Sequence, residues 1–288
     1  MNTLNQKIGF IGAGNMAEAM IGAILRAGLA APENIRISDA STKRRDEVQN
    51  AYNVSAAADN PEIVISCGIV VLSVKPQIID DVLQELAQSC GFKDLSVKRL
   101  FISIAAGIPI SRIEKHLYNG LPEEAKNCLP VIRVMPNTPA LVGAGMSGMC
   151  ANACADKSDL ETARKILSVM GKVIVTQEDK MDAVTAVSGS GPAYGFYLLE
   201  AMIDAGVKLG LERETASELA QTALFGALRL IEEQKETPES LRTKVTSPGG
   251  TTEAAIRVLD QNNVKEAISA AIAAAAQRSR SLSAPENA

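Results

Sequence analysis

An apolar segment, a glycine-rich turn and a helical segment follow one another near the start of the chain. Residues 7–11 read Lys-Ile-Gly-Phe-Ile, and residues 12–17 fit the pattern G-x-G-x-x-A. In this pattern the first glycine allows a tight turn, the second lets backbone approach a pyrophosphate, and the final small residue lets the helix pack closely on the strand. The order of strand, turn and helix therefore predicts a dinucleotide-binding domain.

The first 176 residues alternate short β-branched runs with segments of helical periodicity, which favours a largely parallel, doubly wound sheet covered by helices. The predicted strands are residues 7–11, 34–38, 69–74, 100–104, 131–135 and 172–176, and the predicted helices between them include residues 15–26, 43–52 and 77–89. We therefore expect a Rossmann domain at residues 1–176.

Beyond residue 177 the strand signals stop, and the long segments 192–209, 213–234, 251–260 and 264–280 all have helical character. The segment 194–203 is apolar on nearly all sides, and residues 267–276 are almost continuous alanine and isoleucine. A helix without a polar face needs cover all round, which a domain of this size barely supplies alone. The expected fold class is thus α/β plus all-α, with residues 177–288 forming a helical dimerisation domain of an obligate dimer.

Charge and composition argue against several classes of partner. The chain has 29 Lys and Arg against 33 Asp and Glu, no tryptophan and only 3% aromatic residues, so a nucleic-acid partner is not expected. Its five cysteines are scattered without a Cys-x-x-Cys pair, and His116 is its only histidine, so no metal site is predicted. No apolar segment is long enough to span a bilayer, and the N-terminus lacks signal-peptide character. We expect a cytoplasmic protein without membrane contact.

The residue at the end of the second predicted strand bears on the choice of cofactor. Asp39 stands where an acidic residue grips the ribose hydroxyls of NAD. Ser41, Thr42, Lys43 and Arg44 follow directly, and this polar, cationic run could instead cradle the 2′-phosphate of NADP. The sequence leaves both cofactors open.

The residues available for acid–base chemistry are few. His116 lies among charged residues and is expected on a helix surface, away from catalysis. A β-hydroxyacid dehydrogenase would be expected to carry a lysine on the helix that follows the Gly189-Ser190-Gly191 turn, but no lysine occurs between Lys180 and Lys208. The missing base favours reduction of an iminium carbon, which accepts a hydride without loss of a proton.

A second glycine turn lies at residues 246–252, which read Thr-Ser-Pro-Gly-Gly-Thr-Thr and precede a helical segment. Backbone N–H groups at a helix N-terminus attract small anions, and hydroxyl groups beside them can bind the rest of a ligand. A well-capped helix start without a ligand is the alternative interpretation. A non-catalytic dinucleotide sensor would keep the turn at 12–17 and lose this stretch, whereas both are intact here.

With these motifs identified, the chain resembles the pyrroline-5-carboxylate reductases, which form proline in the last step of its biosynthesis. The resemblance rests on the segments 10–16, 74–77, 135–139, 182–185, 188–194 and 246–252. It implies NAD(P)H-dependent reduction of 1-pyrroline-5-carboxylate to L-proline, a helical domain that interlocks with that of a partner, and a homo-oligomer that reaches a decamer in the family.

The resemblance also implies roles for matching residues. Ser247 and the backbone of Gly249, Gly250 and Thr251 would hold the substrate carboxylate, and Thr252 would hydrogen-bond the ring nitrogen as the catalytic residue. NADP(H) is weakly preferred by resemblance, with NAD(H) as the alternative. The expected cofactor contacts are Gly12, Ala13, Gly14, Asn15, Met16, Ser38, Asp39, Asn60, Val74, Lys75, Pro76, Ala105 and Ala106.

Overall fold

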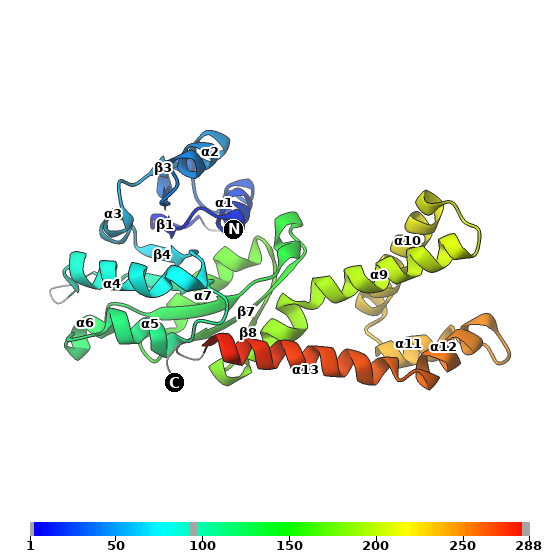
Figure 1. Cartoon of the computed structure of the whole chain (residues 1–288). Helices are drawn as coiled ribbons and strands as arrows, with labels where there is room; N and C mark the ends of the chain where they lie inside the picture. The colour runs from blue at the N-terminus through cyan, green and yellow to red at the C-terminus, as the bar shows by residue number, and fades with distance from the viewer. Residues whose placement is uncertain (1–2, 93–96, 284–288) are drawn as a thin grey trace. The chain divides into compact units, whose positions relative to one another are not determined.

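The computed structural model describes residues 3–92 and 97–283 (Figure 1). The chain divides into two compact units, one that runs to Ser190 and includes the last part of the chain from Ala275, and one from Gly191 to Ala274. This division lies later in the chain than the boundary predicted after residue 176. The reason is local packing, because Met181 and Ala186 are fully buried in the first unit.

The first unit contains an eight-stranded sheet with the order β3-β2-β1-β4-β5-β6-β7-β8. Neighbouring strands pair in parallel from β3 to β6, β7 runs antiparallel to β6, and β8 is parallel to β7. The strands are β1 (Ile8–Ile11), β2 (Ile35–Ser38), β3 (Ser55–Ala56), β4 (Ile69–Leu72), β5 (Leu100–Ser103), β6 (Val131–Met135), β7 (Gly145–Ala151) and β8 (Gly171–Val175). The order reverses between β1 and β4, as in doubly wound dinucleotide-binding folds.

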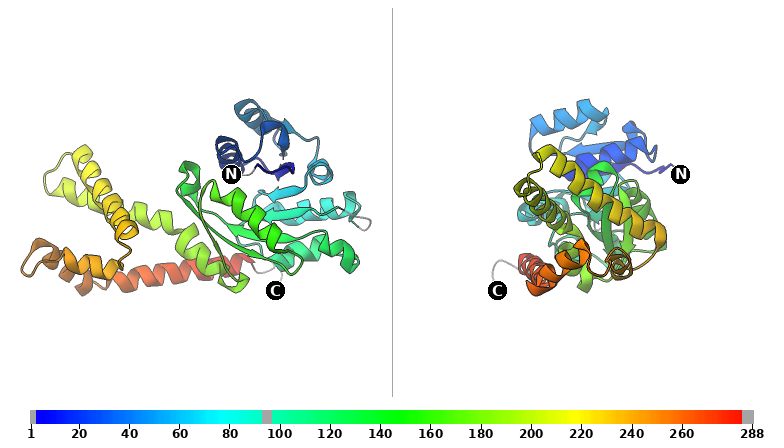
Figure 2. Two further views of the ribbon diagram at one scale, coloured as in Figure 1. Left: turned by 180° about the vertical axis from the view of Figure 1, so that it is seen from behind. Right: turned by 90° about the vertical axis from the view of Figure 1, so that its right-hand side faces the viewer.

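Helices cover both faces of this sheet (Figures 1 and 2). They are α1 (Asn15–Arg26), α2 (Thr42–Tyr52), α3 (Asn60–Ser66), α4 (Ile79–Ser89), α5 (Ile110–Leu117), α6 (Glu123–Asn127), α7 (Lys157–Ser168) and α8 (Met181–Val184). Alternation along β5 shows the two layers: Phe101 joins the core under α3, α4 and α5, whereas Ile102 joins the core under α1 and α7. Both cores consist of buried apolar side chains, and the sheet between them supports the loops at its edge.

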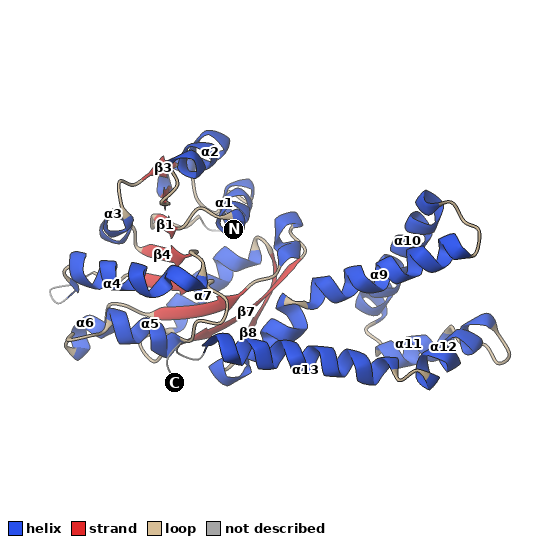
Figure 3. Cartoon of the chain, viewed as in Figure 1, coloured by secondary structure: helices blue, strands red, loops and turns tan. Residues whose placement is uncertain are grey.

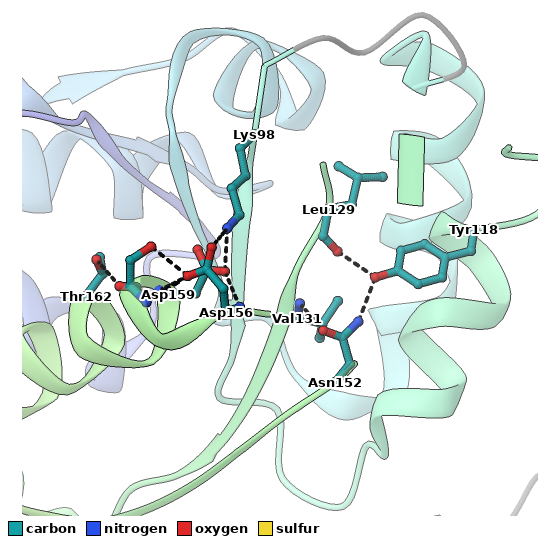
Figure 4. A network of polar contacts seen from close by, with 9 residues as sticks. Lys98, Tyr118, Leu129, Val131, Asn152, Asp156, Asp159 and Thr162 are labelled. Carbon is teal, nitrogen blue, oxygen red and sulfur yellow. Dashed lines mark hydrogen bonds and ion pairs between the residues drawn. The ribbon is translucent and has the colours of Figure 1, made fainter. Parts of the chain in front are cut away.

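Two clusters of polar side chains join segments near the antiparallel strands β6 and β7 (Figure 4). Lys98 Nζ lies 2.8 Å from Asp156 Oδ2 and 2.6 Å from Asp159 Oδ2. Asp156 also caps α7, because its Oδ1 accepts hydrogen bonds from the Ser158 and Asp159 backbone N–H groups. In the second cluster Tyr118 Oη donates to the Leu129 carbonyl at 2.6 Å and accepts from Asn152 Nδ2 at 2.7 Å.

The second unit is helical throughout (Figure 3): every residue from 191 to 274 is described, and none lies in a strand. Its helices are α9 (Gly191–Lys208), α10 (Arg213–Gln234), α11 (Pro238–Lys244) and α12 (Thr251–Gln261), together with the first part of α13 (Val264–Ser283). The predicted α/β plus all-α fold class is confirmed. Large apolar side chains stand exposed on α9 and α10, among them Tyr197, Phe225 and Leu228.

Candidate functional site

The turn between β1 and α1 has the geometry expected of a phosphate-binding loop. Gly12 has φ +94°, and a Cβ there would meet the backbone of Ser73 and Val74 at 2.9 Å, so only glycine fits. A Cβ at Gly14, in contrast, would have no neighbour within 4 Å. Nothing inside the described protein requires glycine at position 14, which suits an approaching ligand.

The first turn of α1 presents free donors at the same place. Gly14 is the N-cap residue of α1, and no side chain caps the helix. The backbone N–H groups of a first helical turn have no partner within the helix, and the dipole is positive there. Ala17, buried to 1% exposure, packs α1 against the sheet and holds the N-terminus in position. The turn can therefore bind a pyrophosphate.

Hydrogen bonds fix the turn to the strands on either side. Gly12 N–H donates to the Ser38 carbonyl at 2.8 Å, and Ser73 Oγ donates to the carbonyls of Ile11 and Gly12 at 3.0 and 2.6 Å. The turn thus sits where the carboxyl ends of β2, β1 and β4 meet, at the reversal of strand order. Ser73 was not among the predicted site residues, because a serine after a strand carries no signal of its own.

Asp39, which the sequence predicts as a ribose contact, lies beside the turn. Its Oδ2 accepts a hydrogen bond of 2.8 Å from the Ala13 backbone N–H, and its Oδ1 accepts one of 2.8 Å from the Ser41 N–H. A carboxylate has about four lone-pair sites, so capacity remains for ribose hydroxyl groups. The geometry orients the carboxylate toward the turn and suits a ribose contact.

Ser38 and Asn60, also predicted as cofactor contacts, lie together. Ser38 Oγ donates to Asn60 Oδ1 at 2.7 Å, and Asn60 Nδ2 donates to Glu85 Oε2 at 2.7 Å. Glu85 lies on α4 and fixes the orientation of the amide, so that the asparagine is held in one position. Glu85 was not among the predicted site residues.

The loops after β4 and β5 stand at the same sheet edge, because these strands are parallel neighbours. Val74 is half-buried, Lys75 is exposed, and Pro76 begins a 3₁₀ turn. In the second loop Ala105 is buried and Ala106 is exposed. Exposed Lys75 and Ala106 are therefore accessible to a ligand at this edge.

An apolar cavity of about 250 Å³ opens beside the turn. It is lined by Met16, Ile104, Ala106, Met135, Pro136, Asn137, Thr138 and Gly189, all of them residues of the first unit. Two of the predicted cofactor residues, Met16 and Ala106, belong to this lining. A flat ring with an apolar face suits such a cavity, and the segment that follows β6 supplies much of its wall.

Asn137 gives this wall its shape. Its Nδ2 lies 3.2 Å from the Ser188 carbonyl oxygen and 3.3 Å from Ser188 Oγ, and its Oδ1 accepts a hydrogen bond of 2.8 Å from the Met146 N–H. One side chain thus joins the segment after β6, the start of β7 and the π-helical turn Thr185–Gly189. This contact gives a structural role to residue 137 of the segment 135–139, one of the segments on which the resemblance rests.

The second glycine turn, in the second unit, begins α12 as predicted. Gly249 has φ +71°, and Gly250 is an N-cap residue without a side-chain cap. Two of the expected anion donors already have partners: Gly250 N–H donates to the Ser247 carbonyl at 2.9 Å, and Gly249 N–H donates to Glu253 Oε2 at 2.6 Å. Glu253 was missed, although a glutamate three residues after an N-cap is a known helix-start signal.

The remaining residues of this turn are placed as follows. Thr252 is half-buried, whereas Ser247 and Thr251 are exposed. A hollow of about 450 Å³ beside α12 is lined by Thr246, Glu253, Ile256, Arg257, Asp260 and Gln261. None of the predicted substrate residues lines it, but Glu253, whose carboxylate accepts from Gly249 N–H, does.

His116 belongs to a separate ionic cluster. It lies half-buried on α5, with Nε2 3.3 Å from Asp80 Oδ1. Arg112 forms two hydrogen bonds to the same carboxylate, at 2.9 and 2.7 Å, and lowers the pKa of Asp80 from its usual value. Among residues 3–92 and 97–283, no three His, Cys, Asp or Glu side chains gather as metal ligands, and no helix is both long and apolar enough to cross a membrane.

Comparison with known proteins identifies the family of this chain. Residues 178–282 match the family model of pyrroline-5-carboxylate reductase dimerisation, and residues 7–107 match that of NADP oxidoreductase, coenzyme F420-dependent. A pyrroline-5-carboxylate reductase of Pseudomonas aeruginosa is 44% identical over 277 residues, which cover 96% of each chain. The chain belongs to the pyrroline-5-carboxylate reductase family.

Other members of the pyrroline-5-carboxylate reductase family are also similar to this chain in sequence and in structure. The Synechocystis enzyme is 42% identical over 276 residues, 96% of this chain and 98% of its own. The solved structure of the Coxiella burnetii reductase matches with a TM-score of 0.87 at 36% identity, covering 98% of this chain and all of that one. The Plasmodium falciparum reductase, solved with NADP bound, matches with a TM-score of 0.84 at 30% identity, covering 98% and 100%. The resemblance inferred from the sequence is confirmed.

Proposed function

We propose that this chain reduces 1-pyrroline-5-carboxylate to L-proline with a reduced nicotinamide dinucleotide. The observation that carries the proposal is its identity of 35–44% with enzymes named pyrroline-5-carboxylate reductase over nearly the whole chain. The activity acts on a C=N bond, and no group in the site has to remove a proton from carbon. This agrees with a chain whose only histidine belongs to the ionic cluster with Asp80.

The first unit fits the cofactor. The open face of Gly14, the uncapped N-terminus of α1 and the carboxylate of Asp39 together suit a pyrophosphate joined to a ribose. The matched NADP oxidoreductase model and the NADP-bound relative support NADP(H), and NAD(H) is compatible with the same residues. When bound, the cofactor supplies the hydride, and the apolar cavity at Met16 and Ala106 suits its nicotinamide end.

The turn at residues 246–252 is the substrate site of this proposal. Ser247 and the N–H groups of Gly249 and Thr251 would hold the substrate carboxylate at the N-terminus of α12, with the Gly250 backbone fixed by its hydrogen bond to the Ser247 carbonyl. The Glu253 carboxylate on Gly249 N–H supports this assignment, because it shows that a carboxylate oxygen fits against that donor. Thr252 would hydrogen-bond the ring nitrogen and orient the ring. A threonine hydroxyl is too weak an acid to act as a strong general acid.

The two parts of the chain have different roles in this proposal. Residues 1–176 would bind the dinucleotide, and residues 177–288 would bind substrate and form the dimer. The matched dimerisation model supports a homo-oligomer, and the exposed Tyr197, Phe225 and Leu228 give it apolar area to bury. An obligate dimer, its further assembly into a decamer and a cytoplasmic location are proposals. Sedimentation of the purified chain should give a mass above that of the monomer at every concentration.

The direct test incubates the purified chain with pyrroline-5-carboxylate and NADPH, and separately with NADH, while the absorbance of the reduced cofactor is followed. We expect oxidation of the cofactor that depends on substrate, together with formation of proline. A matched incubation with β-hydroxyacids and the oxidised cofactor should give no reduction. Turnover of β-hydroxyacids without turnover of the imine would overturn the proposal.

A further inference from the structure

Arg44 reaches from α2 to the glycine turn. Its Nε donates a hydrogen bond of 2.6 Å to the Ala13 carbonyl, and its Nη atoms form ion pairs with Glu18 and Glu47. Ala13 also donates its N–H to Asp39. The residue between the two glycines of the turn is therefore held by Asp39 at its nitrogen and by Arg44 at its oxygen.

This placement puts the Arg44 cation next to the ribose subsite. In dinucleotide-binding folds the acidic residue after the second strand binds the ribose 2′-hydroxyl, and a nearby arginine accommodates a 2′-phosphate. Asp39 occupies the first position here, and Arg44 is the cation joined to it through one residue. A guanidinium beside a phosphate forms charge-assisted hydrogen bonds, often two in parallel.

Glu18 on α1 binds the Arg44 guanidinium and holds it against that helix. It pairs with Arg44 Nη2, and its other oxygen accepts a hydrogen bond of 3.3 Å from Tyr52 Oη. The hydrogen bond to Glu18 is the main reason that the pKa of Arg44 lies above its usual value. Glu18 is only one-third exposed, so the pair is less screened by solvent than a pair on an open surface.

We propose that Glu18 sets the affinity of the site for a 2′-phosphate by holding the Arg44 guanidinium against α1. The proposal rests on the proposed function, since a dinucleotide has to bind at this turn. With Glu18 in place, the charge of Arg44 is neutralised and the carboxylate of Asp39 repels a phosphate. The balance between NADPH and NADH then shifts toward NADH relative to what Arg44 alone would give.

The neighbouring cations have different surroundings. Arg45 donates to Thr42 Oγ1 at 3.1 Å, and Lys43 is exposed. Each is one residue from Arg44 and so turned about 100° around the helix from it. Since Arg44 is the member of the run bound to Ala13, it is the one that Glu18 controls.

Two small probes isolate the 2′-phosphate from the rest of the cofactor. Adenosine 2′,5′-bisphosphate and adenosine 5′-monophosphate differ only in that group, and their binding to the full chain is measured by calorimetry. We expect Glu18→Gln to bind the bisphosphate about tenfold more tightly than the unaltered chain, as for one added hydrogen bond to a charged group. Its affinity for the monophosphate should stay within about twofold. Glutamine keeps the length of the side chain and an acceptor for Tyr52.

Two further variants serve as controls. Glu18→Gln combined with Arg44→Gln should lose the gain, because the gain requires the freed guanidinium. Glu47→Gln, which removes the more exposed partner of Arg44, should raise the affinity for the bisphosphate less than Glu18→Gln does. An unchanged ratio of the two affinities in Glu18→Gln, or a gain that persists without Arg44, would overturn the proposal. Failure of the monophosphate to bind the unaltered chain would overturn it as well. The turnover assay with pyrroline-5-carboxylate then shows separately whether the proposed function survives.

Discussion

Gly249 donates its backbone N–H to the carboxylate of Glu253 at 2.6 Å, so the turn before α12 already holds a carboxylate of its own chain. Glu253 also lies 3.8 Å from Arg257, one turn further along the helix. The side chain therefore has a second partner to which it can rotate when a substrate carboxylate takes the N–H group. In this account Glu253 competes with the substrate.

Removal of that competing charge should strengthen substrate binding. We expect Glu253→Gln to lower the KM for pyrroline-5-carboxylate by about threefold to tenfold, with kcat little changed, because a like charge near the substrate carboxylate is lost. Steady-state kinetics at saturating NADPH measures this. Glu214→Gln, in the first turn of α10, is the matched control and should leave KM unchanged. A raised KM in Glu253→Gln would show that Glu253 helps substrate to bind.

The hydroxyl group of Thr252 is expected to matter for turnover and not for folding. Thr252→Ala should lower kcat by about tenfold, the value of one hydrogen bond to a charged group, and leave the melting temperature close to that of the unaltered chain. Thr252→Ser keeps the hydroxyl and should restore most of the activity. Full activity in the alanine variant would remove Thr252 from the mechanism.

Substitutions of the two glycines in the first turn should have different effects, one on cofactor binding and the other on stability. Gly14→Val adds a side chain where no atom lies within 4 Å, so the variant should fold normally and lose dinucleotide binding. Gly12→Val places a branched side chain at φ +94° against the Ser73 backbone, and should be destabilised by several kcal/mol. Thermal unfolding and titration with NADPH separate the two effects. Equal NADPH affinity in Gly14→Val and the unaltered chain would contradict the assignment of this turn as the dinucleotide site.

The ion pair between Lys98 and Asp156 should contribute to stability in a pH-dependent way. Lys98 holds the pKa of Asp156 well below its usual range. Because the folded pKa is depressed, the stabilisation is present above the unfolded pKa of about 4 and is lost as the pH falls toward the folded value. Lys98→Gln should therefore be less stable than the unaltered chain at pH 7, and the difference should shrink below pH 4. Urea unfolding across this range measures it, and a constant difference would count against the pair.

Much of the first unit was predictable from the sequence, because its parallel strands are buried on both faces and appear as apolar runs such as residues 69–72. β7 was missed because its sequence, Gly-Met-Ser-Gly-Met-Cys-Ala, has no β-branched residue and two glycines. Its pairing with β6 and β8 decides its conformation. The strand at residues 172–176 was predicted, but the antiparallel insertion of β7 between it and β6 is a tertiary outcome that local propensity does not contain.

The candidate site divides in the same way. Gly12, Gly14 and Asp39 follow a pattern in which each residue type has a local reason, and the structure places all three at one turn. Asn137 and the pair of Glu18 with Arg44 depend on contacts between distant segments. No spacing rule marks them, since their partners come together only after the sheet and helices have packed.

In the proposed reaction a hydride moves from the reduced cofactor to the carbon of the C=N bond. The most direct measurement uses NADPH deuterated at the transferring position of the nicotinamide C4, with pyrroline-5-carboxylate as substrate, and analyses the product by mass spectrometry and NMR. We predict proline with one deuterium at C5 and an equal amount of oxidised cofactor. Proline without deuterium, or cofactor oxidation without proline, would contradict it.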